Sequence, residues 1–379
     1  MSLILTDDQQ MFRDAARRFA SERAPVSQLR KLRDDSDPTG FDKNVWKEMA
    51  DLGWAGVLVP EEYGGVAFGF VGAGLIAEEI GRNLSVAPFV STGVLACCAL
   101  SKGGSAAQKH ALLPSIAAGD FLAALAIDER SRHAPHYVAT RAVASGGRYR
   151  LSGRKLHVLD GHVADRLIVS ARTSGDTDSR DGITLFLIDG EAPGVSISRT
   201  HNVDSHNSAS VELHDVPATS EDVIGVVDKG AAVLDDALDA GRAILAAELL
   251  GIAQSAFDRT LVYLREREQF GARIGSFQSL QHRAAHLFCE IEIVRSTVLR
   301  TLQALDAHEP AAQSLTCLAK AKAGQVAQLA TNEAVQMHGG IGMTDEFDIG
   351  FFMKRARAAG ETLGDANYHT DRFAQLAGY

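Results

Sequence analysis

The sequence predicts an α+β chain of three domains: an N-terminal helical domain, a middle antiparallel β-barrel or sandwich, and a C-terminal four-helix bundle. The main observation is a change of pattern at about residue 121 and a second change after Pro217. Apolar residues recur at helical intervals on both sides of this stretch, whereas short β-rich runs separated by turns fill it. A length of 379 residues also exceeds the usual size of one domain. We place the domains at 1–120, 121–222 and 223–379.

The N-terminal domain is predicted to be helical from its first segment. Thr6 and Gln9 have the spacing of a capping box, and apolar residues follow at helical intervals until Pro25. Further helical segments are separated by prolines and paired glycines, and they cover 43–52, 70–81, 90–101 and 105–118.

The middle domain is predicted to contain antiparallel strands. Its β-rich runs cover 149–151, 166–171, 183–188, 195–198 and 211–216. Turn residues such as Gly146-Gly147 and Asp189-Gly190 separate them at a spacing of roughly ten residues, which is typical of a small barrel or sandwich.

The C-terminal domain is predicted to be an antiparallel bundle. An apolar stripe at helical spacing runs from 231 to 266. Similar long segments cover 276–306, 310–338 and 348 to about 376. Four long helices joined by short connections favour a bundle.

Composition excludes several classes of function. The net charge of -10 argues against a nucleic-acid or anionic-membrane surface, because those partners require clustered Lys and Arg. We see no targeting leader and no apolar run of the length of about 18 residues that a membrane helix needs. The four cysteines lack C-x-x-C spacing and fit reduced thiols, so we expect a cytoplasmic protein. The histidines show no metal-ligand spacing, and we expect no metal.

Two short motifs suggest one half of a dinucleotide site. They cover 267–271 and 336–342. A guanidinium and carboxamides can hold pyrophosphate oxygens and ribityl hydroxyls, and adjacent glycines let a backbone approach a phosphate or a flavin edge. This chemistry suits FAD. The candidate cofactor-binding residues are Arg267, Gln269, Phe270, Gln278, Gln336, Gly339 and Gly340.

The order of three landmarks resembles the acyl-CoA dehydrogenase family over essentially the whole chain. The landmarks are Leu52-Gly53-Trp54 with 59–65, Tyr263 with 267–278, and 336–342. Within the family, the chain resembles the small-subunit type, such as the small subunit of pimeloyl-CoA dehydrogenase, in Lys354-Arg355 and 364–366.

The resemblance implies an activity, a cofactor and partners. In the family, a glutamate removes the proton α to the carbonyl of an acyl-CoA thioester, and a hydride leaves the β carbon for the flavin of FAD. The product is a 2-enoyl thioester. The family also implies tetramers, a role in lipid metabolism and β-oxidation, and an electron acceptor such as an electron-transfer flavoprotein.

The catalytic glutamate is missing from both positions that the family uses. The commoner position corresponds to Leu363, and the rarer one to Gly241. Neither residue can accept a proton. Three carboxylates near these positions are candidates for a relocated base, namely Glu361, Asp365 and Glu248.

Two further comparisons with the family pattern concern the ligands. The β-domain stretch that the resemblance assigns to flavin contact lies at residues 126–131. His157 and Leu159 stand where the family pattern has an aromatic residue and a hydroxyl residue. Asp239 and Arg242 keep the family's Asp-x-x-Arg spacing, which contacts the CoA thioester in active members.

The half-site that remains is the half that family members donate to a neighbouring subunit. Our leading hypothesis is therefore an accessory subunit of a hetero-oligomeric acyl-CoA dehydrogenase, whose partner carries the glutamate. The alternatives are a flavin-dependent monooxygenase of the same fold, a homo-oligomeric dehydrogenase with a relocated base, and a purely structural role. The motif residues also have interpretations that need no ligand. Arg267 could be an ordinary surface residue, and Gly339-Gly340 could simply end a helix.

Overall fold

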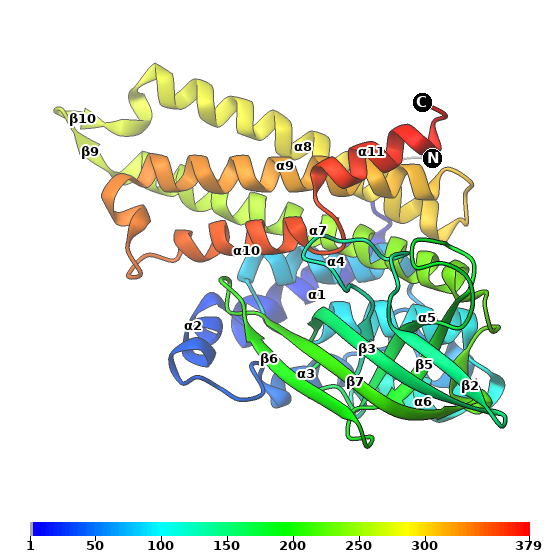
Figure 1. Ribbon diagram of the computed structural model, residues 1–379. Coiled ribbons are helices and arrows are strands. Elements are labelled where there is room, and N and C mark those ends of the chain that lie inside the picture. The colour runs from blue at the N-terminus through cyan, green and yellow to red at the C-terminus, as the bar shows by residue number, and fades with distance from the viewer. Residues whose placement is uncertain (1–2) are drawn as a thin grey trace. The chain divides into compact units, whose positions relative to one another are not determined.

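The computed structural model describes residues 3–379, which form two compact units (Figure 1). The first unit combines the chain up to Lys31 with Phe70–Val86 and Arg242–Tyr379. The second combines Leu32–Gly69 with Ala87–Gly241. The three-part architecture that the sequence predicts, helical then β then helical, is confirmed.

The first unit is helical. Its helices are α1 (Asp7–Arg23), the start of α2 (Val26–Asp34), α4 (Gly69–Asn83), most of α7 (Gly230–Glu266), α8 (Gln278–Asp306), α9 (Ala312–His338), α10 (Ile349–Glu361) and α11 (Ala366–Leu376). Helix α9 packs against α8, α10 and α11, and Figure 1 shows α8, α9 and α10 running alongside one another. The predicted capping box of α1 is confirmed, because Thr6 and Gln9 exchange backbone-to-side-chain hydrogen bonds.

Helices α4 and α7 cross at very short range. A Cβ added to Gly81 would lie 2.1 Å from the Glu248 carbonyl oxygen, and one added to Gly251 would lie 1.9 Å from the Glu78 carbonyl oxygen. Both positions therefore require glycine for the crossing.

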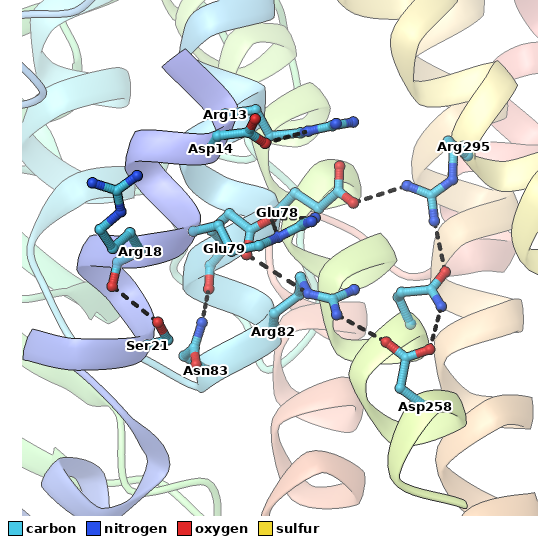
Figure 2. A network of polar contacts seen from close by, with 12 residues as sticks. Arg13, Asp14, Arg18, Ser21, Glu78, Glu79, Arg82, Asn83, Asp258 and Arg295 are labelled. Atoms are coloured by element: carbon cyan, nitrogen blue, oxygen red, sulfur yellow. Dashed lines mark hydrogen bonds and ion pairs between the residues drawn. The ribbon is translucent and has the colours of Figure 1, made fainter. Parts of the chain in front are cut away.

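A polar network joins α1, α4, α7 and α8, and we call it the α4 network (Figure 2). Glu79 pairs with Arg17 of α1 at 2.9 Å. Arg82 pairs with Asp258 of α7 at 2.8 Å, and Glu78 pairs with Arg295 of α8 at 2.9 Å. The Glu79 side chain is only 1% exposed, and burial raises its pKa.

The last predicted helix is interrupted, so the prediction of one helix from 348 to about 376 is wrong. Helix α10 ends at Glu361 and α11 begins at Ala366. Leu363 and Gly364 between them have φ angles of 57° and 106°. Asp365 then caps α11 by accepting a hydrogen bond from the Tyr368 amide at 2.7 Å. Positive φ angles cannot continue a right-handed helix.

The second unit contains the predicted β domain with short helices before it. The helices are α3 (Lys43–Asp51), the π-helix η2 (Phe89–Ala96), α5 (Cys97–Gly103) and α6 (Ala106–Ala117). The strands are β1 (Ala123–Ala126), β2 (Arg141–Ser145), β3 (Arg148–Leu159), β4 (Arg166–Arg172), β5 (Ile183–Asp189), β6 (Val195–His201), β7 (Asn207–Thr219) and β8 (Val223–Ile224).

These strands form one sheet in the order β6-β7-β3-β2-β4-β5-β8. Strand β1 pairs with β4 in parallel, and most other pairs are antiparallel. Leu151, Val169, Phe186 and Val211 belong to its buried core. Every predicted β-rich run lies within one of these strands. Within residues 3–379, no helix has the length and apolarity needed to cross a membrane.

Candidate functional site

The first motif forms a strained hairpin after α7. Strands β9 (Glu268–Gln269) and β10 (Ala272–Arg273) are joined by Phe270 and Gly271, whose φ angles are 54° and 75°. A left-handed conformation costs a residue other than glycine roughly 1–2 kcal/mol. The Phe270 side chain is nevertheless 93% exposed. The hairpin tip therefore combines a left-handed non-glycine residue with an exposed aromatic ring.

The second motif follows the end of α9. The chain turns at Gly339, whose φ is 64°, into the short helix η5 (Gly339–Met343). The next glycine, Gly340, has no positive φ, and a Cβ placed there would meet no atom within 4 Å. The packing of this chain therefore does not require glycine at position 340, but close approach of a ligand to the backbone would.

The structure brings the two motifs together. The Tyr263 hydroxyl donates a hydrogen bond to the His338 carbonyl oxygen at 3.2 Å, and the two rings stack at 4.4 Å. Met337 packs against Leu264 and Ile274 beneath the hairpin. The end of α9 is thus fixed to the segment that carries Arg267.

His338 is a packing residue at this junction. Its Nδ1 lies 2.7 Å from the Ala334 carbonyl oxygen, and its ring also contacts Phe347 at 4.8 Å. Burial lowers the pKa of His338, so the ring is neutral at pH 7.

The predicted cofactor-binding side chains of this region face solvent. Arg267, Gln269, Gln278 and Gln336 are all exposed. Gln269 donates only to the adjacent Glu268 carbonyl oxygen, at 2.8 Å. Within the described part of the chain, the side chains of Arg267 and Gln336 form no hydrogen bond or ion pair. We call Arg267, Phe270, Gln336, Gly339 and Gly340 the exposed half-site. Its free donors and open glycines fit the phosphate end of a dinucleotide.

The residue at the commoner family position for the base is apolar and fixed. Leu363 is 7% exposed and has a left-handed backbone. Its carbonyl oxygen accepts from Arg242 Nε and lies near His369 Nε2, both at 3.1 Å. Gly241 occupies the other position, within α7. No proton acceptor is present at either place.

A buried lysine that the sequence analysis missed holds the same segment. Lys320 of α9 is 1% exposed, and its Nζ donates to the carbonyl oxygens of Ala359, Gly360 and Gly364 at 3.1, 2.8 and 3.1 Å. Ala359 and Gly360 lie in the last turn of α10, whose final carbonyls have no partner within the helix, and Gly364 lies in the linker to α11. Burial lowers the pKa of Lys320 to about 7, and the charge of Arg242 acts in the same direction. A lysine within an alanine-rich apolar stripe is the signal that sequence reasoning had available.

Glu248, the first candidate for a relocated base, is buried in an ion pair. Its Oε1 lies 2.6 Å from Arg355 Nε, and its side chain is 2% exposed.

The other two candidates also have local structural contacts. Glu361 is 52% exposed and pairs with Arg357 one turn earlier at 3.1 Å. Asp365 is the cap of α11 described above. The structure therefore supplies a contact within the chain for each of the three carboxylates.

Asp239 and Arg242 are both buried on α7. They are 7% and 1% exposed. Arg242 reaches the Tyr368 hydroxyl at 3.2 Å in addition to the Leu363 carbonyl. Its observed role is to hold the segment between α10 and α11, and contact with a thioester stays a prediction.

The β-domain residues that should face a flavin have other roles or unsuitable chemistry. Glu129 accepts from Lys155 Nζ at 2.6 Å and from the Ala139 amide at 2.7 Å. His157 is exposed with a φ of 53°, and Leu159 has no hydroxyl to offer. Among residues 3–379, no cluster of three or more His, Cys, Asp or Glu could hold a metal ion.

Comparisons with known proteins cover nearly the full length. Three domain families match: "Acyl-CoA dehydrogenase, N-terminal domain" at 6–120, its middle domain at 129–216 and its C-terminal domain at 228–377. A probable acyl-CoA dehydrogenase of Bacillus subtilis is 31% identical over 370 residues, with 94% of each chain covered.

Two solved structures are also similar. One is a steroid ACAD variant named Tcur3481-Tcur3483, at 30% identity, a TM-score of 0.87 and 98% coverage of both chains. The other is butyryl-CoA dehydrogenase of Megasphaera elsdenii, at 26% identity, a TM-score of 0.90 and 100% coverage of both chains.

Proposed function

The chain belongs to the acyl-CoA dehydrogenase family, and we propose that it serves there as the accessory subunit of a hetero-oligomer. In this proposal its exposed half-site completes the FAD site of a partner dehydrogenase chain. One observation carries the proposal: the half-site, formed by the start of the hairpin and the end of α9, is exposed, while both base positions lack a carboxylate.

The half-site residues fit the pyrophosphate end of FAD. The Arg267 guanidinium would pair with phosphate oxygens, and the carboxamides of Gln278 and Gln336 would hold hydroxyls or phosphate. Gly339 and Gly340 would admit the cofactor close to the backbone. When bound, FAD supplies the ring that accepts a hydride from the thioester.

Catalysis by this chain alone lacks a base. Removing an α proton requires a positioned carboxylate with a raised pKa, which contributes roughly 100-fold to 10,000-fold. Glu248 is held by Arg355, and Asp365 caps a helix. We therefore assign the glutamate and the acyl pocket to the partner, which would also set the acyl-chain specificity.

The similarity to Tcur3481-Tcur3483 supports a two-chain assembly, since that structure carries a double designation. We propose a tetramer of two chain types, with this chain of the small-subunit type. An electron-transfer flavoprotein as electron acceptor and a cytoplasmic location complete the proposal, in line with the bacterial relative.

The visible absorption spectrum tests the proposal. The chain is purified alone and co-expressed with a dehydrogenase-like partner chain, and acyl-CoA is then added without oxygen. We expect little flavin with the chain alone, and one FAD per two chains, bleached by acyl-CoA, in the assembly. A yellow chain that bleaches alone would overturn the accessory role and favour a relocated base. Turnover that depends on oxygen and a flavin reductase would instead show a monooxygenase.

A further inference from the structure

We infer that Arg30 is a positioning residue for the exposed half-site, through the turn that follows its glycines. This inference rests on the proposed function, because it concerns FAD affinity. Arg30 lies on α2, more than 300 residues before the turn that it holds. None of the three landmarks includes it.

The contacts of Arg30 converge on the turn at 344–348. Its Nη1 donates to the Asp345 carbonyl oxygen at 2.6 Å and to Asp345 Oδ2 at 3.0 Å. Its Nη2 donates to Asp348 Oδ1 at 2.9 Å. The guanidinium also lies over the Phe351 ring, 4.7 Å from its centroid. Two nitrogens, two carboxylates and a ring fix its orientation.

Asp348 is shared with a second helix. Arg259 of α7 approaches Asp348 Oδ2 at 3.5 Å and lies 5.0 Å from the centre of the Phe352 ring. Asp348 stands at the N-cap of α10, where its side chain would ordinarily accept a backbone N–H. It makes no such capping bond. The carboxylate instead ties the turn to Arg30 and Arg259.

The glycine segment between His338 and Asp345 therefore has two anchors. His338 is held at one end by the ring contacts with Tyr263 and Phe347. Arg30 holds the other end. Packing between them is concentrated at Gly342, which is buried against Val335, whereas a Cβ at Gly339 or Gly340 would meet no atom within 4 Å and Met343 is 76% exposed. The anchors thus determine the shape of the segment before a ligand arrives, and such preorganisation strengthens binding.

Arg30 should affect the affinity for FAD more than it affects the stability of the fold. The Arg30 side chain is 26% exposed, and its partners Asp345 and Asp348 are 60% and 31% exposed, so these partly exposed pairs contribute modestly to the free energy of unfolding. Loss of Arg30 should therefore loosen the glycine segment while the fold stays intact. A misplacement of about 1 Å in a binding segment can cost a large factor in function.

The test compares Arg30→Ala with Arg33→Ala in the co-expressed assembly. Arg33 is a matched control, because it lies one turn further along α2, is 27% exposed and pairs with Asp34 of its own helix. The readouts are the FAD dissociation constant by fluorescence titration, hydrogen exchange of 339–348 in the isolated chain, and the melting temperature. We expect Arg30→Ala to weaken FAD binding about tenfold and to speed exchange, with Arg33→Ala affecting neither.

Two further variants sharpen the result. Asp348→Asn keeps the shape but removes the charge, and it should reproduce the exchange effect even where Arg30→Ala folds poorly. Arg30→Lys restores one charge without the two-point contact and should recover FAD binding only in part. Unchanged affinity and unchanged exchange in Arg30→Ala would overturn the inference. Failure of the proposed function looks different: FAD binding would then not respond to Arg267→Ala, while exchange at 339–348 would still report on Arg30.

Discussion

The α4 network and the exposed half-site use the same kinds of side chain for opposite purposes. In the network, Glu79 is 1% exposed, and the arginines around it have carboxylate partners on neighbouring helices. In the half-site, Arg267 and Gln336 are exposed and unpartnered within the described residues. Polar groups that are paired within the chain hold helices together. Those left free, on a backbone that is itself fixed, are available to a partner.

Lys320→Met tests the interior side of this comparison and should have the largest effect. It removes three hydrogen bonds and leaves the carbonyls of Ala359, Gly360 and Gly364 without this donor. Each unsatisfied buried group costs about 1–3 kcal/mol, so we expect a loss of about 3 kcal/mol in the free energy of unfolding. Denaturant unfolding measures it.

The control for this change lies two residues further along α9. Lys322 is 31% exposed and pairs with Glu290. Lys322→Met should change stability by less than about 1 kcal/mol. Equal losses for the two variants would show that the buried lysine has no special role.

Arg267→Ala tests the exposed side. Loss of a charge-assisted phosphate contact should weaken FAD binding to the assembly by about 2 kcal/mol, or roughly 30-fold, with the stability of the isolated chain unchanged. Titration of the apo-assembly with FAD provides the measurement. Arg265→Ala is the matched control, because Arg265 is also exposed and lies in the last turn of α7. A drop in melting temperature without a change in FAD affinity would show that Arg267 stabilises the fold, as the arginines of the α4 network do, and does not bind FAD.

The sequence predicted what local patterns encode. The capping-box spacing of Thr6 and Gln9 predicted the start of α1, and unbroken apolar stripes predicted α7, α8 and α9. It did not predict the break at Leu363, because the leucine itself carries no local signal, although Gly364 and Asp365 beside it are residues typical of a helix end and a helix N-cap. Strand β2 was also missed, because only one of its five residues, Val143, is β-branched.

In the site, too, local patterns predicted some residues and missed others. The motifs themselves identified Arg267 and Gln336 as candidates, and the structure shows their segments side by side. The contacts of Lys320 and Arg30 were not predictable, since their partners lie far away in the sequence. Long-range contacts of this kind follow from the fold and not from any local pattern.

Acid should destabilise the segment between α10 and α11 through His369, which contacts the Leu363 carbonyl oxygen. Burial lowers the pKa of His369 to about 2, and the charges of Lys320 and Arg242 act in the same direction. The unfolded chain binds a proton near pH 6.5 while the folded chain does not, so stability falls as the pH decreases below about 6.5. One such group contributes at most about 1.4 kcal/mol per pH unit.

A variant isolates this contribution. His369→Gln keeps a donor for the Leu363 carbonyl but does not titrate. The slope of the free energy of unfolding between pH 6.5 and 4.5 should therefore be smaller in the variant than in the natural chain. Identical slopes would assign the acid sensitivity to other groups.

We expect the smallest effect at Phe270. A substitution there should increase the stability of the isolated chain and decrease FAD binding by the assembly, so it tests both parts of the comparison. Phe270→Asn places a residue that tolerates a left-handed backbone beside Gly271, as a two-residue hairpin prefers. We expect the isolated chain to gain about 1 kcal/mol in the free energy of unfolding. The assembly should retain less FAD, because an exposed aromatic contact is lost. Phe270→Leu keeps both strain and apolar surface and should gain no stability. If Phe270→Asn neither stabilised the chain nor reduced FAD content, the hairpin tip would be an ordinary turn and not a contact surface shaped for a partner.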